Sequence, residues 1–295
     1  MILTLALSPS LDVTYEVDEL HHGAITRPAR VTRVAGGKPL NVARVARAMN
    51  ADVRAIAALG GYTGGWIADL LAADDVAVDV IPIRHETRTC SAIVERSGGA
   101  SSTDIYEPAT PVSSEEWAAF RAATLDVADR HAGWAVFSGS IPQGVSADDV
   151  AGLLDELRAR DLRVAVDSSG PGLRALAPAA DLVKVNRAEA EEALGQPQPT
   201  ARAAAHALGT EPGKIVIITD GIRGGHAVFG RDEFPLAPPK SIGRFSAGSG
   251  DTFLGALIAA LDRSMSPAAA LELASEAAER NALVPGPGRL DSSRI

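Results

Sequence analysis

The segment LVKVNRAEAEEAL, residues 182–194, contains both kinds of regular structure from which this chain is built. Leu182–Val185 is a short apolar run that predicts a buried strand, and Arg187–Leu194 follows at once with the pattern of a helix. The next apolar run, KIVIIT at 214–219, is again of the fully buried type. Strands that alternate with helices form a mostly parallel sheet with helices on both faces, so this segment predicts an α/β fold.

The same alternation extends in both directions from this segment. Further strands are predicted at Ile2–Leu7, Val53–Ala58, Val76–Ile83, Ala132–Phe137 and Leu162–Val166. Further helices are predicted at Leu40–Met49, Gly65–Ala73, Ala147–Arg160, Phe253–Leu261 and Pro267–Ala282. We therefore expect a single domain over residues 1–295, with a central sheet between two layers of helices and a loose tail at Pro285–Ile295.

Two stretches break this rhythm with β character and no helix. The first is Val13–Val34, and the second is Thr87–Tyr106, which alternates in polarity on either side of a turn at Gly98-Gly99 and predicts a hairpin. We expect them to pair into a small β-sheet lid, formed by about 10–35 and 84–108. Such a lid would cover the carboxyl edge of the main sheet, where open α/β sheets bind ligands.

Composition excludes several classes of protein. The 295 residues carry 28 basic and 37 acidic side chains, a net charge of −9, which argues against nucleic-acid binding. No apolar stretch approaches the length of a membrane span, and the opening residues lack a targeting pattern. The single cysteine, Cys90, cannot form an internal disulfide, and one cysteine with six scattered histidines gives no zinc-site spacing. We therefore expect a cytoplasmic protein.

The most distinctive stretch is FSAGSGDTFLG at 245–255, where three small residues precede Asp251 and an amphipathic helix. Amides at a helix N-terminus favour an anion, and a carboxylate beside them can accept a proton from an alcohol. An anion hole with a base is what phosphoryl transfer to a hydroxyl requires. The alternative is an aspartate that only caps a helix after a glycine-rich turn.

A second glycine-rich turn, VAGGKPLNVARVA at 34–46, places a lysine and an asparagine before a helix. It is not a Walker A loop, because Lys38 is followed by Pro39. The turn predicts a cradle for an oxyanion, and the alternative is an ordinary connection between a strand and a helix.

Two further motifs follow buried strands. Lys184, Asn186 and Glu189 lie at the end of the 182–185 strand, where amide and carboxylate oxygens suit Mg²⁺, although Asn186 with Glu189 also fits a helix capping box. IITDGIRGG at 217–225 ends a strand in a glycine-rich turn, which predicts either a nucleotide phosphate site or a simple hairpin. Asp12 and Ser138 also follow predicted strands, at the edge where ligands bind.

Taken in order, these features resemble the PfkB (ribokinase-like) carbohydrate kinases over nearly the whole chain. The motifs that carry the resemblance are ALSPSLD (6–12), AGGKPLNVARV (35–45), SGSIPQGV (138–145), DSSG (167–170), VKVNRAEAE (183–191), TDGIRGG (219–225) and SAGSGDTFLGAL (246–257). The LSPSLD opening, Lys38, SGSIPQGVS and the DSS of 167–169 most resemble the branch of 1-phosphofructokinases and tagatose-6-phosphate kinases. The family's usual glycine after that lysine is Pro39 here, its usual GAGD is GSGD, and its usual KPN is KVN.

The resemblance implies a role for each matching residue. Asp251 is the implied base, and the amides of Gly248, Ser249 and Gly250 are the implied anion hole. The implied substrate residues are Asp12, Gly37, Asn41 and Ser138 for the sugar, with Lys38 and Arg88 for a phosphate already on it. ATP and Mg²⁺ are the implied cofactors, held by Lys184, Asn186, Glu189, Thr219, Gly221 and Gly224.

These motifs lead us to expect an ATP- and Mg²⁺-dependent kinase of a phosphorylated ketohexose, such as fructose 1-phosphate or tagatose 6-phosphate. One alternative is a kinase of an unphosphorylated sugar or a nucleoside, against which the two cations Lys38 and Arg88 argue. An alternative of another class is a non-catalytic protein that binds sugar phosphates. Free strands in the lid would be consistent with a homodimer formed through it.

Overall fold

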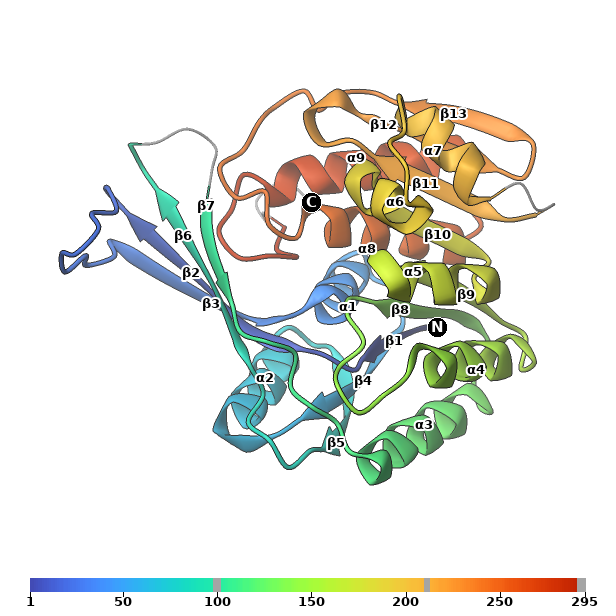
Figure 1. Cartoon of the computed structure of the whole chain (residues 1–295), viewed down its shortest axis with the longest axis horizontal. Helices are drawn as coiled ribbons and strands as arrows, with labels where there is room; N and C mark the ends of the chain where they lie inside the picture. The colour runs from blue at the N-terminus through green and yellow to red at the C-terminus, as the bar shows by residue number, and fades with distance from the viewer. Residues whose placement is uncertain (98–101, 210–212, 291–295) are drawn as a thin grey trace.

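Strands and helices alternate along the chain and build a central sheet with a mostly parallel arrangement (Figure 1). The computed structural model describes residues 1–97, 102–209 and 213–290. Within them the large sheet has the strand order β13-β12-β11-β10-β9-β8-β1-β4-β5, and only β12 and β13 run antiparallel to their neighbours. The predicted fold class is confirmed. Its strands are β1 (Ile2–Ala6), β4 (Val53–Leu59), β5 (Ala77–Pro82), β8 (Gly133–Ser138), β9 (Leu162–Asp167), β10 (Leu182–Asn186), β11 (Ile215–Thr219), β12 (Gly225–Phe229) and β13 (Asp232–Leu236).

Helices cover both faces of this sheet, and the sheet separates two apolar cores. One core lies under α1 (Lys38–Ala48), α2 (Gly61–Ala73), α8 (Ser249–Asp262) and α9 (Pro267–Asn281). The other lies under α3 (Ser114–Ala128), α4 (Ala147–Arg158), α5 (Gly170–Leu176), α6 (Arg187–Leu194) and α7 (Ala201–Leu208). Alternate residues of β1 enter opposite cores, with Ile2 in the first and Leu3 in the second, as the two-residue period of a strand requires. In the described parts of the chain, no helix combines the length and the apolar character needed to cross a membrane.

The order of the strands fixes where a ligand can bind. From β1 the chain proceeds outward through β4 and β5, whereas from β8 it proceeds in the other direction through β9, β10 and β11. The strand order therefore reverses between β1 and β8, which are parallel. Open α/β sheets bind ligands in the crevice beyond the carboxyl ends of the strands at such a point. The last residues of four strands at this edge are polar: Ser138, Asp167, Asn186 and Thr219.

The two β insertions form a separate four-stranded sheet that projects from the main body (Figure 1). Its order is β3-β2-β6-β7, built from β2 (Ser10–Val17), β3 (Arg30–Gly36), β6 (Thr89–Glu95) and β7 (Ser102–Tyr106). β6 and β7 are antiparallel, so the predicted hairpin is confirmed, while its predicted turn at Gly98-Gly99 lies outside the described residues. β2 begins at Ser10, opposite Gly36 at the end of β3. Gly37 then caps α1, so the small sheet is joined directly to that helix.

Helix α8 occupies the centre of the molecule and is almost entirely buried, which is why its sequence is apolar on all sides. It packs against α1 at Gly255, where a Cβ atom would lie only 2.8 Å from the carbonyl oxygen of Val42. This close approach brings the start of α8 next to the start of α1. The two glycine-rich turns that the sequence singles out therefore meet at the carboxyl edge of the sheet.

The chain after α9 does not behave as predicted. The tail predicted to be loose is Pro285–Ile295, of which 291–295 lie outside the described residues, but Gly286 and Gly288 are buried against the rest of the protein. Both glycines have positive φ, 98° and 68°, a conformation that lets the backbone turn tightly and approach α1. Residues rich in proline and glycine can thus form an ordered turn when their backbone packs directly on a helix.

Candidate active site

Asp251 lies in the first turn of α8 with its side chain buried against α1. Gly248 precedes this turn with φ 78°, a left-handed conformation that costs glycine little. The amides of Gly250 and Asp251 belong to the first turn of the helix, which has no acceptors within the helix itself. A glycine-rich turn and a carboxylate thus lie together at one helix start, but of the three amides predicted as an anion hole, at Gly248, Ser249 and Gly250, that of Ser249 donates to the Ser246 carbonyl over 3.2 Å.

Burial controls the protonation of Asp251. Loss of solvent, with the nearby Asp167 carboxylate, raises the pKa of Asp251 to about 6, despite opposing contributions from Lys38 and Lys184. The Asn41 side-chain N–H donates to Oδ2 of Asp251 over 2.8 Å and also lowers this pKa. A carboxyl group with a pKa near 6 is a stronger base than an ordinary aspartate and is still mostly ionised at neutral pH.

Asp167, the last residue of β9, connects two lysines that approach from different elements. Its Oδ1 accepts from Lys38 Nζ and its Oδ2 from Lys184 Nζ, each over 2.7 Å. Burial alone would raise the pKa of Asp167, but the two ammonium groups outweigh it and hold the pKa below its usual value. Sequence reasoning quoted this residue in a motif without giving it a role, although a carboxylate at a strand end beside the predicted cleft was the signal.

Lys38 also contacts the predicted metal residue Glu189, with 3.2 Å between Nζ and Oε1. Burial opposes the charge on Lys38, yet the carboxylates of Asp167 and Glu189 outweigh it and raise the pKa of Lys38 above its usual value. Lys184 lies on the other side, where its Nζ is 2.8 Å from the place a Cβ on Gly250 would take. Two ammonium groups therefore flank the turn that precedes Asp251.

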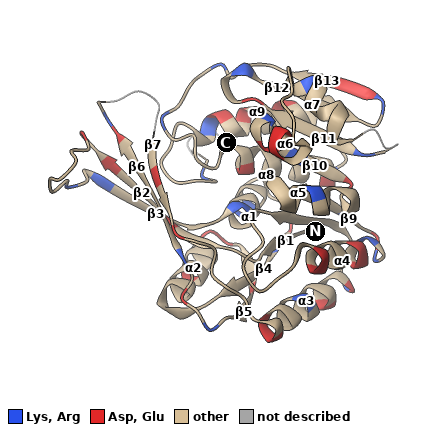
Figure 2. Cartoon of the chain, viewed as in Figure 1, with Lys and Arg blue, Asp and Glu red and all other residues tan. Residues whose placement is uncertain are grey.

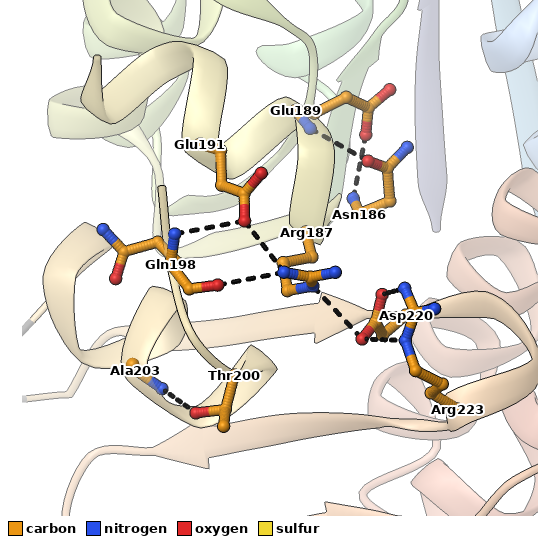
Figure 3. Close-up of polar contacts among 9 residues, drawn as sticks. All are labelled: Asn186, Arg187, Glu189, Glu191, Gln198, Thr200, Ala203, Asp220 and Arg223. Atoms are coloured by element: carbon orange, nitrogen blue, oxygen red, sulfur yellow. Dashed lines mark hydrogen bonds and ion pairs between the residues drawn. The ribbon is translucent and has the colours of Figure 1, made fainter. Parts of the chain in front are cut away.

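Asn186 and Glu189 form the capping box that was one of the two interpretations of their spacing (Figure 3). The Glu189 N–H donates to Asn186 Oδ1 over 2.9 Å, and the Asn186 N–H donates to Glu189 Oε2 over 2.8 Å. Their oxygens are of the type that Mg²⁺ prefers, but among the described residues no cluster of three or more acidic, histidine or cysteine side chains could hold a metal by itself. The pair fits an ion that is held mainly by phosphate oxygens and water.

The three residues predicted to contact a nucleotide line one cavity with the start of α8. Thr219, Gly221 and Gly224 border a space of about 230 Å³ together with Ser249 and Gly250. Ile222, Ile242 and Phe253 give this cavity an apolar part. β11 and β12 are antiparallel, so the turn between them is the hairpin of the alternative interpretation, and this hairpin borders the cavity.

An ion-pair network that sequence reasoning missed holds this turn in place (Figure 3). Arg187 at the start of α6 and Arg223 within the turn both donate to Asp220, with Nε–Oδ2 distances of 3.2 and 2.8 Å. Hydrogen bonds from Arg223 and then from Arg187 outweigh partial burial and lower the pKa of Asp220. Arg187 Nη1 also donates to Glu191 Oε1 on the same helix over 2.9 Å, so the Arg187–Asp220 contact ties the turn to α6.

On the small-sheet side, Asp12 points at the turn before α1. It accepts from Ser10 Oγ over 2.6 Å and from the Gly37 N–H over 3.4 Å. A Cβ on Gly36 would overlap its carboxyl group at 2.0 Å, so a glycine is required there. Burial is the main cause of a raised pKa at Asp12, against the hydrogen bonds that favour its charged form.

Arg88 has three backbone partners that the sequence did not indicate. Its guanidinium donates to the backbone carbonyls of Ser8 and Glu107, each over 3.1 Å, and to that of Pro9 over 3.4 Å. Arg88 thus joins both strands of the hairpin to the end of β1, while Lys38 contacts carboxylates across the cleft. Ser138 lies between these regions at the end of β8, and its buried hydroxyl oxygen has no hydrogen-bond partner.

Comparison with known proteins places this geometry in a family. Residues 7–292 match the model of the pfkB family carbohydrate kinases, so the chain belongs to that family and the predicted resemblance is confirmed. A tagatose-6-phosphate kinase of Staphylococcus epidermidis is 32% identical over 173 residues, which are 59% of this chain and 54% of the relative. The chain therefore spans about half the length of this curated relative in the match.

Solved structures agree over almost the whole chain. The phosphofructokinase-2 of Escherichia coli in complex with potassium is 26% identical, with a TM-score of 0.87 and coverage of 98% of this chain and 94% of that one. A possible 1-phosphofructokinase of Thermotoga maritima has a TM-score of 0.89 at 18% identity, covering 99% and 94% of the two chains. This second similarity concerns the fold alone.

Proposed function

We propose that this protein transfers a phosphoryl group from ATP to a hydroxyl of a phosphorylated ketohexose, of the fructose 1-phosphate or tagatose 6-phosphate type. The observation that carries the proposal is the Asp251 carboxylate, buried at the N-terminus of α8 between Lys38 and Lys184. Membership of a carbohydrate kinase family supports the reaction class, and the names of the relatives support a sugar phosphate as the acceptor.

Each part of the site has a role in this reaction. Asp12, Gly37 and Asn41 bind sugar hydroxyls, and Asp251 accepts the proton of the hydroxyl that attacks. The first-turn amides of α8 and the Lys184 ammonium stabilise the charge on the transferred phosphoryl group. Thr219, Gly221 and Gly224 line the nucleotide cavity. Mg²⁺, when bound, neutralises the nucleotide phosphates, and Asn186 with Glu189 supplies oxygens toward it.

The proposal extends to closure of the site, to association of two copies and to location. We expect the small sheet to close over the sugar and exclude water, which would otherwise accept the phosphoryl group. We also expect two copies to associate through this sheet, because every residue of its edge strand β7 is exposed. The acidic charge of −9 and a cytoplasmic location fit an enzyme of small anionic metabolites whose cations lie inside a cleft, and basic and acidic side chains are interspersed in the view of Figure 2.

One observation favours the second candidate, a kinase of an unphosphorylated sugar or nucleoside. The argument against it was that a neutral substrate would leave Lys38 and Arg88 unpaired. Both already have partners within the protein, since Lys38 contacts two carboxylates and Arg88 donates to three carbonyls. The charge of the substrate must therefore be decided by measurement.

The deciding experiment is ATP turnover against a panel that pairs each sugar with its phosphate: fructose with fructose 1-phosphate and fructose 6-phosphate, and tagatose with tagatose 6-phosphate, with ribose and adenosine added. The proposal expects ADP release with at least one sugar phosphate and little with its parent sugar. Turnover that is equal or higher with a neutral sugar or nucleoside supports the second candidate. Binding of a sugar phosphate without turnover would indicate the non-catalytic alternative.

A further inference from the structure

Arg44, on α1, is a buried arginine that none of the roles above uses. It is 5% exposed, and every nitrogen of its guanidinium donates a hydrogen bond. Nε contacts Asp74 Oδ2 over 2.7 Å at the outer end, and Nη2 donates to the carbonyl of Ala35. Nη1 donates to Asn41 Oδ1 over 3.1 Å and to the carbonyl of Pro287 over 3.0 Å. Burying such a cation costs free energy, which is offset only if its hydrogen bonds have good geometry.

The contact with Asn41 decides which way that amide points. Arginine can only donate, so the Asn41 atom that faces Arg44 must be the amide oxygen. The Asn41 nitrogen then faces Asp251 Oδ2, at 2.8 Å, as a donor. If the amide were reversed, an oxygen would face the carboxylate and repel it. Arg44 therefore orients the one side chain that donates a hydrogen bond to Asp251 from α1.

The contact with Pro287 connects Arg44 to the other side of Asp251. A Cβ on Gly248 would lie 2.5 Å from Pro287 Cβ, so the turn before α8 rests on this proline. Gly288 packs on Asn41, where its own Cβ would lie 2.9 Å from the Asn41 Cα. One guanidinium thus holds the backbone that supports the turn before α8 and the amide that contacts the carboxylate.

We propose that Arg44 is a positioning residue for the reaction, which fixes the amide of Asn41 and, through it and the Pro287 turn, the orientation of the Asp251 carboxylate. This inference rests on the proposed function for its kinetic consequence. With Oδ2 held by Asn41, the other carboxylate oxygen is the one left to accept the proton from the substrate hydroxyl. Loss of the Asn41 donation disfavours the charged form of Asp251.

The test compares Arg44→Met with a matched control, Asp74→Asn. Both variants remove the ion pair at the outer end of Arg44, but only Arg44→Met frees Asn41 and Pro287. The other charged groups that face Asp251, which are Lys38, Lys184 and Asp167, are unchanged in both. We expect Arg44→Met to lower kcat at least ~10-fold with a small change in KM for ATP, and to shift the acid limb of kcat/KM upward by about one pH unit.

A second measurement does not depend on kinase activity. The difference in unfolding free energy between Asp251 and Asp251→Asn chains, followed against pH, reports the pKa of Asp251 by linkage. We expect that pKa to be higher by about one unit in the Arg44→Met background and unchanged in the Asp74→Asn background. This result would stand even if the panel of substrates showed that the proposed function is wrong.

Arg44 would be only structural if Arg44→Met and Asp74→Asn lost similar stability while the acid limb and the linkage pKa stayed at their original values. If Arg44→Met does not fold, Arg44→Lys replaces it, because one ammonium keeps the charge but cannot contact Ala35, Asn41 and Pro287 together. An upward shift of about half a unit in folded Arg44→Lys supports the inference, and no shift overturns it.

Discussion

The ammonium group of Lys38 lies 2.7 Å from Oδ1 of Asp167, a buried carboxylate whose other oxygen contacts Lys184. Asp167 is 0% exposed, so these are charges removed from water whose mutual attraction is weakly screened. A lysine predicted to hold the substrate phosphate is thus neutralised by the protein itself. A substrate anion that binds Lys38 must compete with Asp167 and Glu189 for the ammonium group. This competition lowers the affinity that Lys38 can contribute for the anion.

Asp167→Asn tests how much this pairing supports the fold. The substitution leaves two lysines near an uncharged amide, and loss of one partner from a buried ion pair typically costs about 3–5 kcal/mol of unfolding free energy. We expect a loss at the lower end of that range, because Glu189 still faces Lys38. Urea unfolding at pH 7.5 measures it. Glu156→Gln, which breaks a partly exposed pair with Arg121, should cost less than about 1 kcal/mol, and equal losses would contradict the expectation.

Asp251→Asn should separate activity from stability. Removal of a general base lowers turnover by roughly 10²–10⁴-fold. Burial raises the pKa of Asp251 from 3.8 to about 6, so the folded state binds this proton more tightly than the unfolded state. Its ionisation therefore costs stability as pH rises from about 4 through 6, by about 2–3 kcal/mol in all. The variant should be more stable than the wild type above pH 6 and similar to it below pH 4.

Thermal unfolding of both chains at pH 4 and pH 8 measures this difference, and ADP release measures the turnover. A variant with more than half of the wild-type kcat would show that Asp251 is not the general base. A variant no more stable at pH 8 than the wild type would show that the carboxyl group is not held in a destabilised state.

Glu189→Gln should raise the Mg²⁺ concentration needed for half-maximal rate. Glutamine can still accept the Asn186 N–H, so the capping box is kept while the charge is lost. Glu191→Gln is the matched control on the same helix, since its carboxylate faces Arg187 and the Gln198 N–H and not Lys38. An Mg²⁺ titration that is identical for the two variants would leave Glu189 with a structural role only.

The sequence predicts those features of this molecule that depend on local pattern. The strand ends that carry Ser138, Asn186 and Thr219 follow from short apolar runs, and the two insertions follow from their alternation. The start of α8 follows from small residues before an apolar helix. Helices α3, α5 and α7 were not predicted. α5 and α7 have only seven and eight residues, which is too short for a helical repeat of apolar residues to stand out.

Long-range pairing could not be predicted in the same way. Asp167 lies 129 residues from Lys38 and 17 from Lys184, and no local pattern shows that three charges so spaced share one point. The three backbone carbonyls that accept hydrogen bonds from Arg88 could not be predicted either, because a sequence pattern does not show which carbonyls a side chain meets. The resemblance to a family supplied the candidate residues, whereas the structure supplied their partners.

The last prediction concerns the choice of substrate. Arg88 donates to the carbonyls of Ser8 and Pro9, and Gly37, the residue before Lys38, packs on the same segment, where its Cβ would lie 3.3 Å from the oxygen of Ser8. Arg88 uses three of its five N–H groups on carbonyls, so two remain for a phosphate. Two charge-assisted contacts of about 1.5–3 kcal/mol each predict a preference for the sugar phosphate over its parent sugar of at least ~10²-fold in kcat/KM.

Lys38→Met and Arg88→Lys should reduce this preference by different routes. Lys38→Met removes one phosphate contact outright, and we expect it to abolish most of the preference while the KM for ATP stays within about twofold. Arg88→Lys keeps a positive charge, but its one ammonium group must serve both the backbone carbonyls and the substrate. We therefore expect the preference for the sugar phosphate to fall about tenfold. The parent sugar is the internal control, because neither variant removes a group that binds its hydroxyls. If both variants lower kcat/KM equally for the sugar and for its phosphate, these cations do not select the phosphate. Lys38 would then stay paired with Asp167 and Glu189 during the reaction, as it is in the structure.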